Sequence, residues 1–341
     1  MINSNSAPLQ ADEYNRTPLH FACDALTAER LVKDGADPEA KDVFGMSALH
    51  LSVCAANLGV CRFLVHLRSS LLSDRDLAGN MPIHWANNRE ILQFLLDARS
   101  DLSAKNNHGQ TPAMRCCVRG DLPSVITILE HFYDVNSADS KGMTMLMVAS
   151  ELGHGKIVDL LLEKNADVNR KDMSGWTALH FASLGAWPQH ETHPLIMKAL
   201  LEHGADPNAI ELSAGWRPLH VATDACAVRV LHEFNADLDA VDNNGRAAVH
   251  YLNADSVAEL LSRKAKLDVR DKYGRTPMHL AAHFEKVVIL QAVGLDLNAV
   301  DNDGKTPLDW AHDRPDVEAT LKSLGAKPGA ELRHSRTCCL L

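Results

Sequence analysis

The chain has 341 residues, of which 46% are hydrophobic, 23% are charged and only 5% are aromatic. This composition supports a folded protein and excludes a fibre or a disordered tail, but it offers few large rings for one deep core. The 44 acidic and 34 basic residues give a formal charge of −10, which argues against a general nucleic-acid binder because phosphate contacts need clustered Lys and Arg.

The chain begins with a polar segment. Met1 is followed by Ile2 to Gln10, which lacks the apolar core of a signal peptide. The eight cysteines do not follow the paired spacing of a small secreted protein, which fits a reducing compartment. We therefore expect residues 1–13 to be the N-terminal tail of a cytoplasmic protein.

Between residues 14 and 325, a phrase of the form T-P-L-H-x-A recurs ten times. A glycine stands two places before nine of the copies, and an aspartate stands five places before seven of them. Repeats of about 30 residues predict a row of small units that share their cores with their neighbours. The copies begin at Thr17, Ser47, Met81, Thr111, Thr144, Thr177, Arg217, Ala247, Thr276 and Thr306.

Each part of the phrase predicts a piece of local structure. Asp-x-x-Gly predicts a tight turn, because Gly accepts a positive φ and Asp bonds the backbone of its own turn. Thr then caps a helix that has Pro at its first position. A second apolar helix follows, as at Ile157 to Leu162, and ends at a residue such as Gly204 or Asn165. One unit is therefore predicted to be helix, loop, helix and hairpin turn.

The chain resembles the ankyrin-repeat family, whose T-P-L-H-x-A and G-A-D signatures are matched by Thr17 to Ala22 with Gly35 to Asp37, and by Thr177 to Ala182 with Gly204 to Asp206. The resemblance covers about residues 14–325. It implies an all-α solenoid of about ten helix-loop-helix units with projecting hairpins. It also implies protein recognition, with neither enzymatic chemistry nor a cofactor.

Several units are trimmed between their two helices. One of them, at residues 82–88, together with the preceding residues 61–76, resembles the ankyrin portion of calcium-independent patatin-like phospholipases. No Gly-x-Ser-x-Gly elbow follows a strand, and no residues remain for an α/β domain. This likeness leaves one alternative open, a regulatory ankyrin subunit or truncated relative of such an enzyme.

Seven phrases carry a histidine, which stands beside the turn of its own unit. An imidazole there can satisfy backbone groups, so we interpret these residues as structural and predict no metal site. Met114, Met147 and Asp309 replace the histidine in three units, whose hairpins we expect to be held less firmly. The seven are His20, His50, His84, His180, His220, His250 and His279.

The residue directly before each phrase changes in character along the chain, from apolar to basic. Trp176 and Trp216 occupy it in adjacent units, where they can anchor a partner or stack on the next hairpin as filler. An inserted loop carries Trp187, which can likewise face a partner or fold back over its own helices. We predict that a protein binds on the hairpin, concave face at Met143, Met173, Trp176, Trp187, Trp216, Arg246, Tyr273 and Arg275.

Residues 326–341 are predicted to be a flexible tail, which ends in Cys338-Cys339-Leu340-Leu341. These four residues match the C-a-a-X pattern of prenylation, and Leu341 favours a geranylgeranyl group on Cys338. A single lipid gives reversible membrane attachment, whereas lipids on both Cys338 and Cys339 would give firm attachment.

The sequence as a whole predicts a monomeric, non-enzymatic adaptor or scaffold. It would bind one or more proteins, no nucleic acid, and the cytosolic face of a membrane through its lipid. Besides the phospholipase-related subunit, the repeats and tail are compatible with a secreted bacterial effector that its host lipidates.

Overall fold

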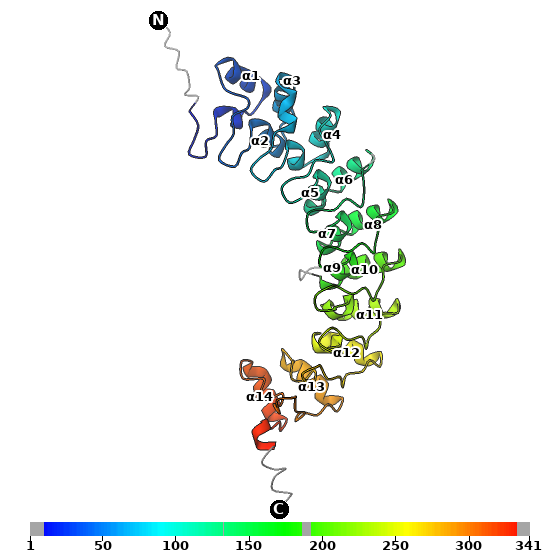
Figure 1. Ribbon diagram of the computed structural model, residues 1–341. Helices are drawn as coiled ribbons and strands as arrows, with labels where there is room; N and C mark the ends of the chain where they lie inside the picture. Colours follow the sequence, from blue (N-terminus) through cyan, green and yellow to red (C-terminus); the bar gives the residue numbers. More distant parts are fainter. Residues whose placement is uncertain (1–9, 132, 186–191, 333–341) are drawn as a thin grey trace, which may run out of the picture. The chain divides into compact units, whose positions relative to one another are not determined.

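The computed structural model describes residues 10–131, 133–185 and 192–332 (Figure 1). The described residues form short helices and three isolated antiparallel bridges, with no strand among them. Backbone contacts divide the chain into unit 1, residues 1–149 with 156–166, and unit 2, residues 150–155 with 167–341. The structure thus confirms the predicted all-α repeat architecture.

Unit 1 contains the helices up to α6 and most of α7 and α8. Its α-helices are α1 (Ala25–Lys33), α2 (Ala48–Cys54), α3 (Leu58–Leu67), α4 (Arg89–Asp97), α5 (Pro112–Arg119), α6 (Leu122–Leu129), α7 (Met145–Glu151) and α8 (Gly155–Glu163). Its 3₁₀ helices are η1 (Pro18–Phe21), η2 (Ser69–Ser73) and η3 (Pro82–Trp85).

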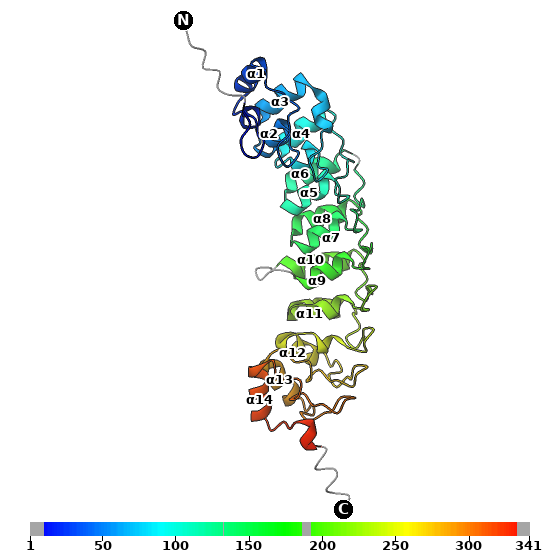
Figure 2. The ribbon, with the colours of Figure 1, turned by 60° about the vertical axis from the view of Figure 1, so that its left-hand side comes forward.

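Unit 2 contains the later repeats, and α9 to α12 follow one another in a stack in both views (Figure 1, Figure 2). Its α-helices are α9 (Ala178–Leu184), α10 (Thr192–Glu202), α11 (Ala225–Glu233), α12 (Ala254–Ser262), α13 (Phe284–Ala292) and α14 (Pro315–Ser323). Its 3₁₀ helices are η4 (Pro218–Val221) and η5 (Ala248–His250).

The first helix of a repeat is shorter than predicted wherever the repeat is trimmed. In four of these repeats the phrase forms only one 3₁₀ helix, η1, η3, η4 or η5, and residues 277–280 form a turn. The repeats that keep the full spacing form a true α-helix, as in α5 and α9. Removing about three residues removes the last turn of the first helix, so the trimming shortens the helix as well as the loop.

The second helix of each repeat supplies part of the core. In α3, Val60 and Leu64 are at most 1% exposed, and in α12 Val257 and Leu260 are buried to the same extent. The side chain of Asn57 caps α3 by accepting the N–H of Val60 at 3.2 Å. The apolar face and the polar cap together fix where each of these helices begins and how it faces its neighbours.

The hairpins are organised by the predicted aspartate turn. In unit 2, Asp172 Oδ1 accepts the backbone N–H groups of Ser174 at 2.9 Å and Trp176 at 2.8 Å. Gly175 has a φ of +85°, and a Cβ there would lie 2.9 Å from the backbone nitrogen of Leu212 in the next hairpin. Glycine is therefore needed both for the turn and for the approach of the next repeat.

The phrase histidines link consecutive repeats. His50 Nδ1 accepts the N–H of Ser47 at 3.1 Å, and its Nε2 lies 3.1 Å from the carbonyl oxygen of Asn80 in the next repeat. Burial lowers the pKa of His50 and of His180 to about 4, which keeps the imidazole neutral and able to accept at Nδ1. These contacts support the structural interpretation of the phrase histidines.

The beginning of the predicted tail packs against the last repeat. Asp309 Oδ2 accepts the N–H of Thr306 and the N–H of Gly329, both at 2.8 Å. Thr306 Oγ1 donates to the carbonyl oxygen of Lys327 at 2.8 Å. The tail was expected to be flexible from residue 326, but Asp309 holds residues 327–329, and residues 329–332 form a helical turn. The weaker hairpin expected at Asp309 is therefore tied to the tail instead.

Lys286 is an unusual core residue. It is 3% exposed on α13, at a position that α3 and α4 fill with Val60 and Ile91, and its Nζ donates to the carbonyl oxygen of His250 at 3.1 Å. Within the described ranges no carboxylate forms an ion pair with it. Burial lowers the pKa of Lys286 from 10.5 to about 7.

We expect Lys286→Met to stabilise the protein in a pH-dependent way. The folded-state pKa lies below that of the unfolded chain, so burial of the charge penalises folding fully below about pH 7 and is relieved as pH rises towards 10.5. The variant should gain up to about 4 kcal/mol at pH 7, at about 1.4 kcal/mol per pKa unit. Urea titrations at pH 7 and pH 10 measure this, and a gain independent of pH would contradict it.

We also expect Asp309→Ala to release the start of the tail. Loss of a hydrogen bond to a carboxylate costs about 1.5–3 kcal/mol, so amide exchange at residues 327–332 should accelerate by about tenfold or more. Hydrogen exchange followed by mass spectrometry measures the rate. Asp313→Ala, which removes an exposed carboxylate nearby, is the control. Equal exchange in all three proteins would show that Asp309 does not hold the tail.

Candidate functional site

Five consecutive repeats present the residue before their T-P-L-H phrase from the same backbone position. In four of them an aspartate Oδ1 accepts the N–H of that residue, at 2.8 Å for Trp176 and at 2.9 Å for Arg246, Arg275 and Lys305. In the remaining repeat, Oε1 of the longer Glu211 side chain accepts the N–H of Trp216 at 3.1 Å. The turns therefore hold a row of residues at equivalent backbone positions, one in each repeat of unit 2.

The first half of this row is aromatic. The ring of Trp176 lies 5.4 Å from His180 and 5.2 Å from Phe181, and Trp216 meets Tyr251 edge to face at 5.6 Å. His180 Nε2 approaches the carbonyl oxygen of Trp216 at 3.3 Å, which connects the two groups of rings. Both tryptophans are half-buried, so each is fixed by packing and still offers ring surface to a partner.

The second half of the row is basic. Asp271 Oδ2 lies 3.1 Å from Arg246 Nε and 2.8 Å from Arg275 Nη2, so one carboxylate holds two guanidinium groups. The guanidinium of Arg275 lies 4.5 Å from the ring centre of Tyr273 and 5.3 Å from that of Trp310. Lys305 Nζ lies 5.4 Å from the ring of Trp310. These are cation–π distances, at which the rings hold the cations in place.

The carboxylate of Asp271 is ionised. Burial raises its pKa, but hydrogen bonds from Arg275, the backbone and Arg246 outweigh burial and lower the pKa below the usual value. For Arg246, burial opposes the charge, but contacts with Tyr251 and Asp271 raise its pKa. Both members of the pair are therefore charged at neutral pH.

We call these contacting residues the aromatic–basic stripe. It consists of Trp176, Phe181, Trp216, Arg246, Tyr251, Tyr273, Arg275, Lys305 and Trp310. Five of these residues were predicted from the sequence to bind a partner. In the structure, each of them contacts another residue of the stripe or shares a contact with it.

The ring residues directly after the histidine position of the phrase were not predicted from the sequence. Tyr251 donates its hydroxyl to Asp242 at 2.5 Å, and Trp310 donates its indole N–H to Asp301 at 2.9 Å. Each ring reaches back nine residues to the aspartate of its own turn. The signal was present as the variable position of T-P-L-H-x-A, which is Phe, Tyr or Trp in these repeats.

The remaining residues that were predicted from the sequence as site residues are not part of the stripe. Met173 is 73% exposed at a hairpin tip, where Leu212, 71% exposed, follows it in the next hairpin. Met143 belongs to unit 1, so the structure does not join it to the stripe. Trp187 and Cys338 lie outside the described residues.

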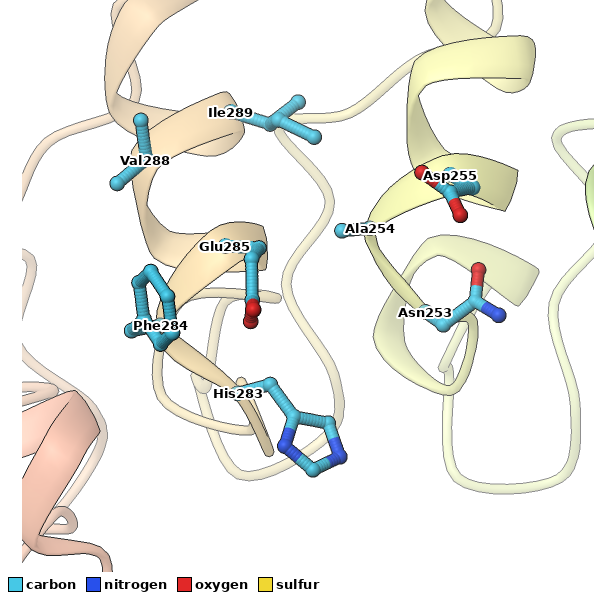
Figure 3. Close-up of a pocket in the computed structure, with 8 residues that line it drawn as sticks. All are labelled: Asn253, Ala254, Asp255, His283, Phe284, Glu285, Val288 and Ile289. Carbon is cyan, nitrogen blue, oxygen red and sulfur yellow. The ribbon is translucent and has the colours of Figure 1, made fainter.

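A recess of about 660 Å³ lies between the N-terminal turns of α12 and α13 (Figure 3). Ala254 and Ile289 face each other across it, and its rim carries the exposed side chains of Asp255, His283 and Glu285. Over the ranges that the structure describes, no group of three or more His, Cys, Asp or Glu side chains is arranged to hold a metal ion. The helices described here are also too short or too polar to cross a membrane.

Comparison with known proteins gives the same architecture. The family described as "Ankyrin repeats (3 copies)" matches residues 24–106, 83–172, 114–211 and 247–331. Among solved structures, the ankyrin repeat domain of Bcl-3, described as a unique member of the IkappaB protein family, matches with a TM-score of 0.53 and 28% identity. This match covers 64% of the present chain and 100% of that domain.

Two curated proteins are similar to part of the chain. Human neurogenic locus notch homolog protein 2 is 36% identical over 137 residues, which are 37% of this chain and 6% of that protein. Palmitoyltransferase AKR1 of Lachancea kluyveri is 29% identical over 141 residues, 37% of this chain and 19% of that protein. The chain therefore spans only a small part of the length of either relative.

Proposed function

Because the chain belongs to the ankyrin-repeat family, whose repeats are protein-interaction modules, we propose that it is a non-enzymatic adaptor that binds its partner along the aromatic–basic stripe. The observation that carries this proposal is the continuous line of contacts from Trp176 to Lys305. Aromatic and arginine side chains dominate binding energy at protein interfaces, and here a rigid scaffold fixes both kinds in one row.

The apolar half of the stripe supplies the anchors. Trp176 and Trp216 are each half-buried by ring contacts, so binding a partner immobilises little additional side-chain freedom. The exposed Met173 and Leu212 extend the apolar surface at the hairpin tips. This arrangement favours the binding interpretation of the two tryptophans, although their packing also stabilises the repeats.

We expect the double variant Trp176→Ala, Trp216→Ala to lose partner binding. Truncation of such hot spots costs about 2 kcal/mol or more, so the affinity should fall by about 30-fold or more. Quantitative affinity capture from native cells, compared between wild type and variant, identifies the partners that depend on the stripe. Titration of the main partner then gives the affinity.

The matched control is Trp85→Ala, which removes the same side chain from unit 1. Circular dichroism and thermal unfolding must show that both variants are folded. If the folded double variant binds as tightly as wild type, the partner site lies elsewhere, and Trp187 is then the next residue to replace.

The membrane tether is a separate part of the proposal. The chain ends in Cys338-Cys339-Leu340-Leu341, which fits a C-a-a-X box, and Leu341 favours geranylgeranyl transfer. Residues 327–329 pack against the last repeat. The described residues end at 332, and nine residues of the sequence, 333–341, follow them. A prenyl group there would hold the adaptor at the cytosolic face of a membrane.

We expect Cys338→Ser to move the protein from the membrane fraction to the soluble fraction of eukaryotic cells. Each buried methylene contributes about 0.8 kcal/mol to partitioning, so loss of the isoprenoid removes most of the membrane affinity. Leu341→Ser is the matched control, because it should redirect labelling towards farnesyl and keep the protein on membranes. An unmodified C-terminus in the intact mass of protein from its native cells would contradict the tether and leave the stripe proposal unaffected.

A further inference from the structure

We propose that the basic half of the stripe binds acidic side chains of an extended segment of the partner protein. This inference rests on the proposed adaptor function and adds the chemistry of the ligand. The basic half consists of Arg246, Tyr273, Arg275, Lys305 and Trp310.

The cations of the basic half are more exposed than the carboxylates beside them. The Asp271 side chain is fully buried, with 0% exposure, whereas the side chains of Arg246 and Arg275 remain 20% and 12% exposed. Each of the three turns carries one ionised carboxylate, Asp242, Asp271 and Asp301, so the charges of the basic half balance. These carboxylates are buried, and their oxygens already accept the N–H groups of the turns, the guanidinium groups, or the polar hydrogens of Tyr251 and Trp310. Lys305 is exposed and forms no ion pair with the carboxylates of the described residues. The charged groups of the basic half that remain open to a ligand are therefore the cations, on a chain whose formal charge is −10.

The cations are already held in place before a ligand arrives. Arg275 lies between the rings of Tyr273 and Trp310 and is also bonded to Asp271, so little of its side-chain freedom remains to be lost. The planar guanidinium matches a carboxylate in two-point hydrogen bonding. The flanking rings exclude water, which strengthens a charge-assisted hydrogen bond relative to one in bulk solvent. A carboxylate on a flexible segment can use this arrangement at low entropic cost.

The repeat geometry sets the spacing of the acidic residues. Packed helices of neighbouring repeats lie about 8–10 Å apart, and an extended chain rises about 3.3 Å per residue. An extended segment that runs along the stripe therefore advances about three residues per repeat. Acidic residues about three positions apart would meet Arg246, Arg275 and Lys305 in turn, and an apolar residue about three positions earlier would meet Trp216.

A polypeptide fits this surface better than a polyanion does. Three basic residues over three repeats are a sparse array, whereas nucleic acids and anionic membranes present dense negative charge to a chain that is itself strongly acidic. The aromatic half that continues from Arg246 through Tyr251 to Trp216 offers apolar contacts that a peptide side chain can fill. The combination selects a segment with both apolar and acidic side chains.

A labelled peptide tests the inference directly on the full-length protein. The probe has about twelve residues, one Leu followed by Glu at every third position with Ser and Gly between them, and the matched probe carries Gln in place of Glu. Fluorescence anisotropy at low salt should show binding of the Glu peptide at least about tenfold tighter than the Gln peptide. Its affinity should fall as salt is added, because exposed charges are screened.

The variants locate the binding site. Arg246→Gln with Arg275→Gln should weaken binding of the Glu peptide by about tenfold or more, since charge-assisted hydrogen bonds are lost. Lys305→Gln and Tyr273→Ser change exposed side chains and should each weaken it by a smaller factor, even if the arginine variant folds poorly. The control, Lys198→Gln with Arg229→Gln, removes two exposed cations from α10 and α11 and should leave the affinity unchanged.

Four results would overturn the inference. They are no binding of the Glu peptide, equal binding of both peptides, equal losses in the stripe and control variants, and stripe-dependent binding of phosphatidylserine vesicles without peptide binding. The proposed function fails separately. If Trp176→Ala, Trp216→Ala abolishes capture of the native partner and the arginine variant does not, the adaptor stands and only the acidic ligand is wrong.

Discussion

The binding surface depends on hairpin carboxylates that use their two oxygens for different tasks. In Asp271, Oδ1 accepts the N–H groups of Tyr273 and Arg275 and thereby closes the turn. Oδ2 accepts hydrogen bonds from Arg246 of the preceding repeat and from Arg275 of its own. Because the same side chain closes the turn and fixes the cations, the binding surface is as rigid as the hairpin. Replacing such an aspartate would disturb folding and recognition together.

The phrase histidines complement this carboxylate. In six of the seven, the ring accepts a backbone N–H within its own repeat and reaches a carbonyl oxygen of the next, as His180 does with Thr177 and Trp216. His250 differs, because its Nδ1 lies 3.1 Å from the carbonyl oxygen of Ala247 in its own repeat. Consecutive hairpins are also joined by backbone hydrogen bonds, such as Leu212 N–H to the carbonyl of Ser174 at 2.9 Å. Two such links per interface leave little freedom for one hairpin to rotate relative to the next. A row of side chains on adjacent hairpins can therefore keep its spacing.

The recurring phrase was enough to predict the repeats, the turns and the role of the histidines, because all of these depend on residues close together in sequence. It also placed Trp176, Trp216 and Arg246 at equivalent positions, since the register is shared. It did not predict which equivalent positions face solvent. Met46 and Asn80 occupy the same position in unit 1 but are only 8% and 5% exposed, because neighbouring side chains that differ from repeat to repeat cover them.

Contacts between residues that are far apart in the sequence could not be predicted from it. The shared carboxylate of Asp271 joins Arg246 to a turn 25 residues later, and Asp309 binds Gly329 across 20 residues. No pattern marks either pairing, because it depends on which side chains meet after the repeats have packed. The docked tail also depends on a glycine, since a Cβ on Gly329 would lie 2.1 Å from the carbonyl oxygen of Gly304.

The exchange of histidine for aspartate at position 309 has a physical reason within the last repeat. A histidine there would offer its Nε2 to the carbonyl of a following hairpin, as His279 does with Lys305 at 3.2 Å. The segment that follows Thr306 instead presents the N–H of Gly329, which requires an acceptor. Asp309 supplies that acceptor and still receives the N–H of Thr306, the group that the histidine would have bound. The stack can therefore end at this repeat with its backbone bonds satisfied, and Lys305 stays exposed at the basic end of the stripe.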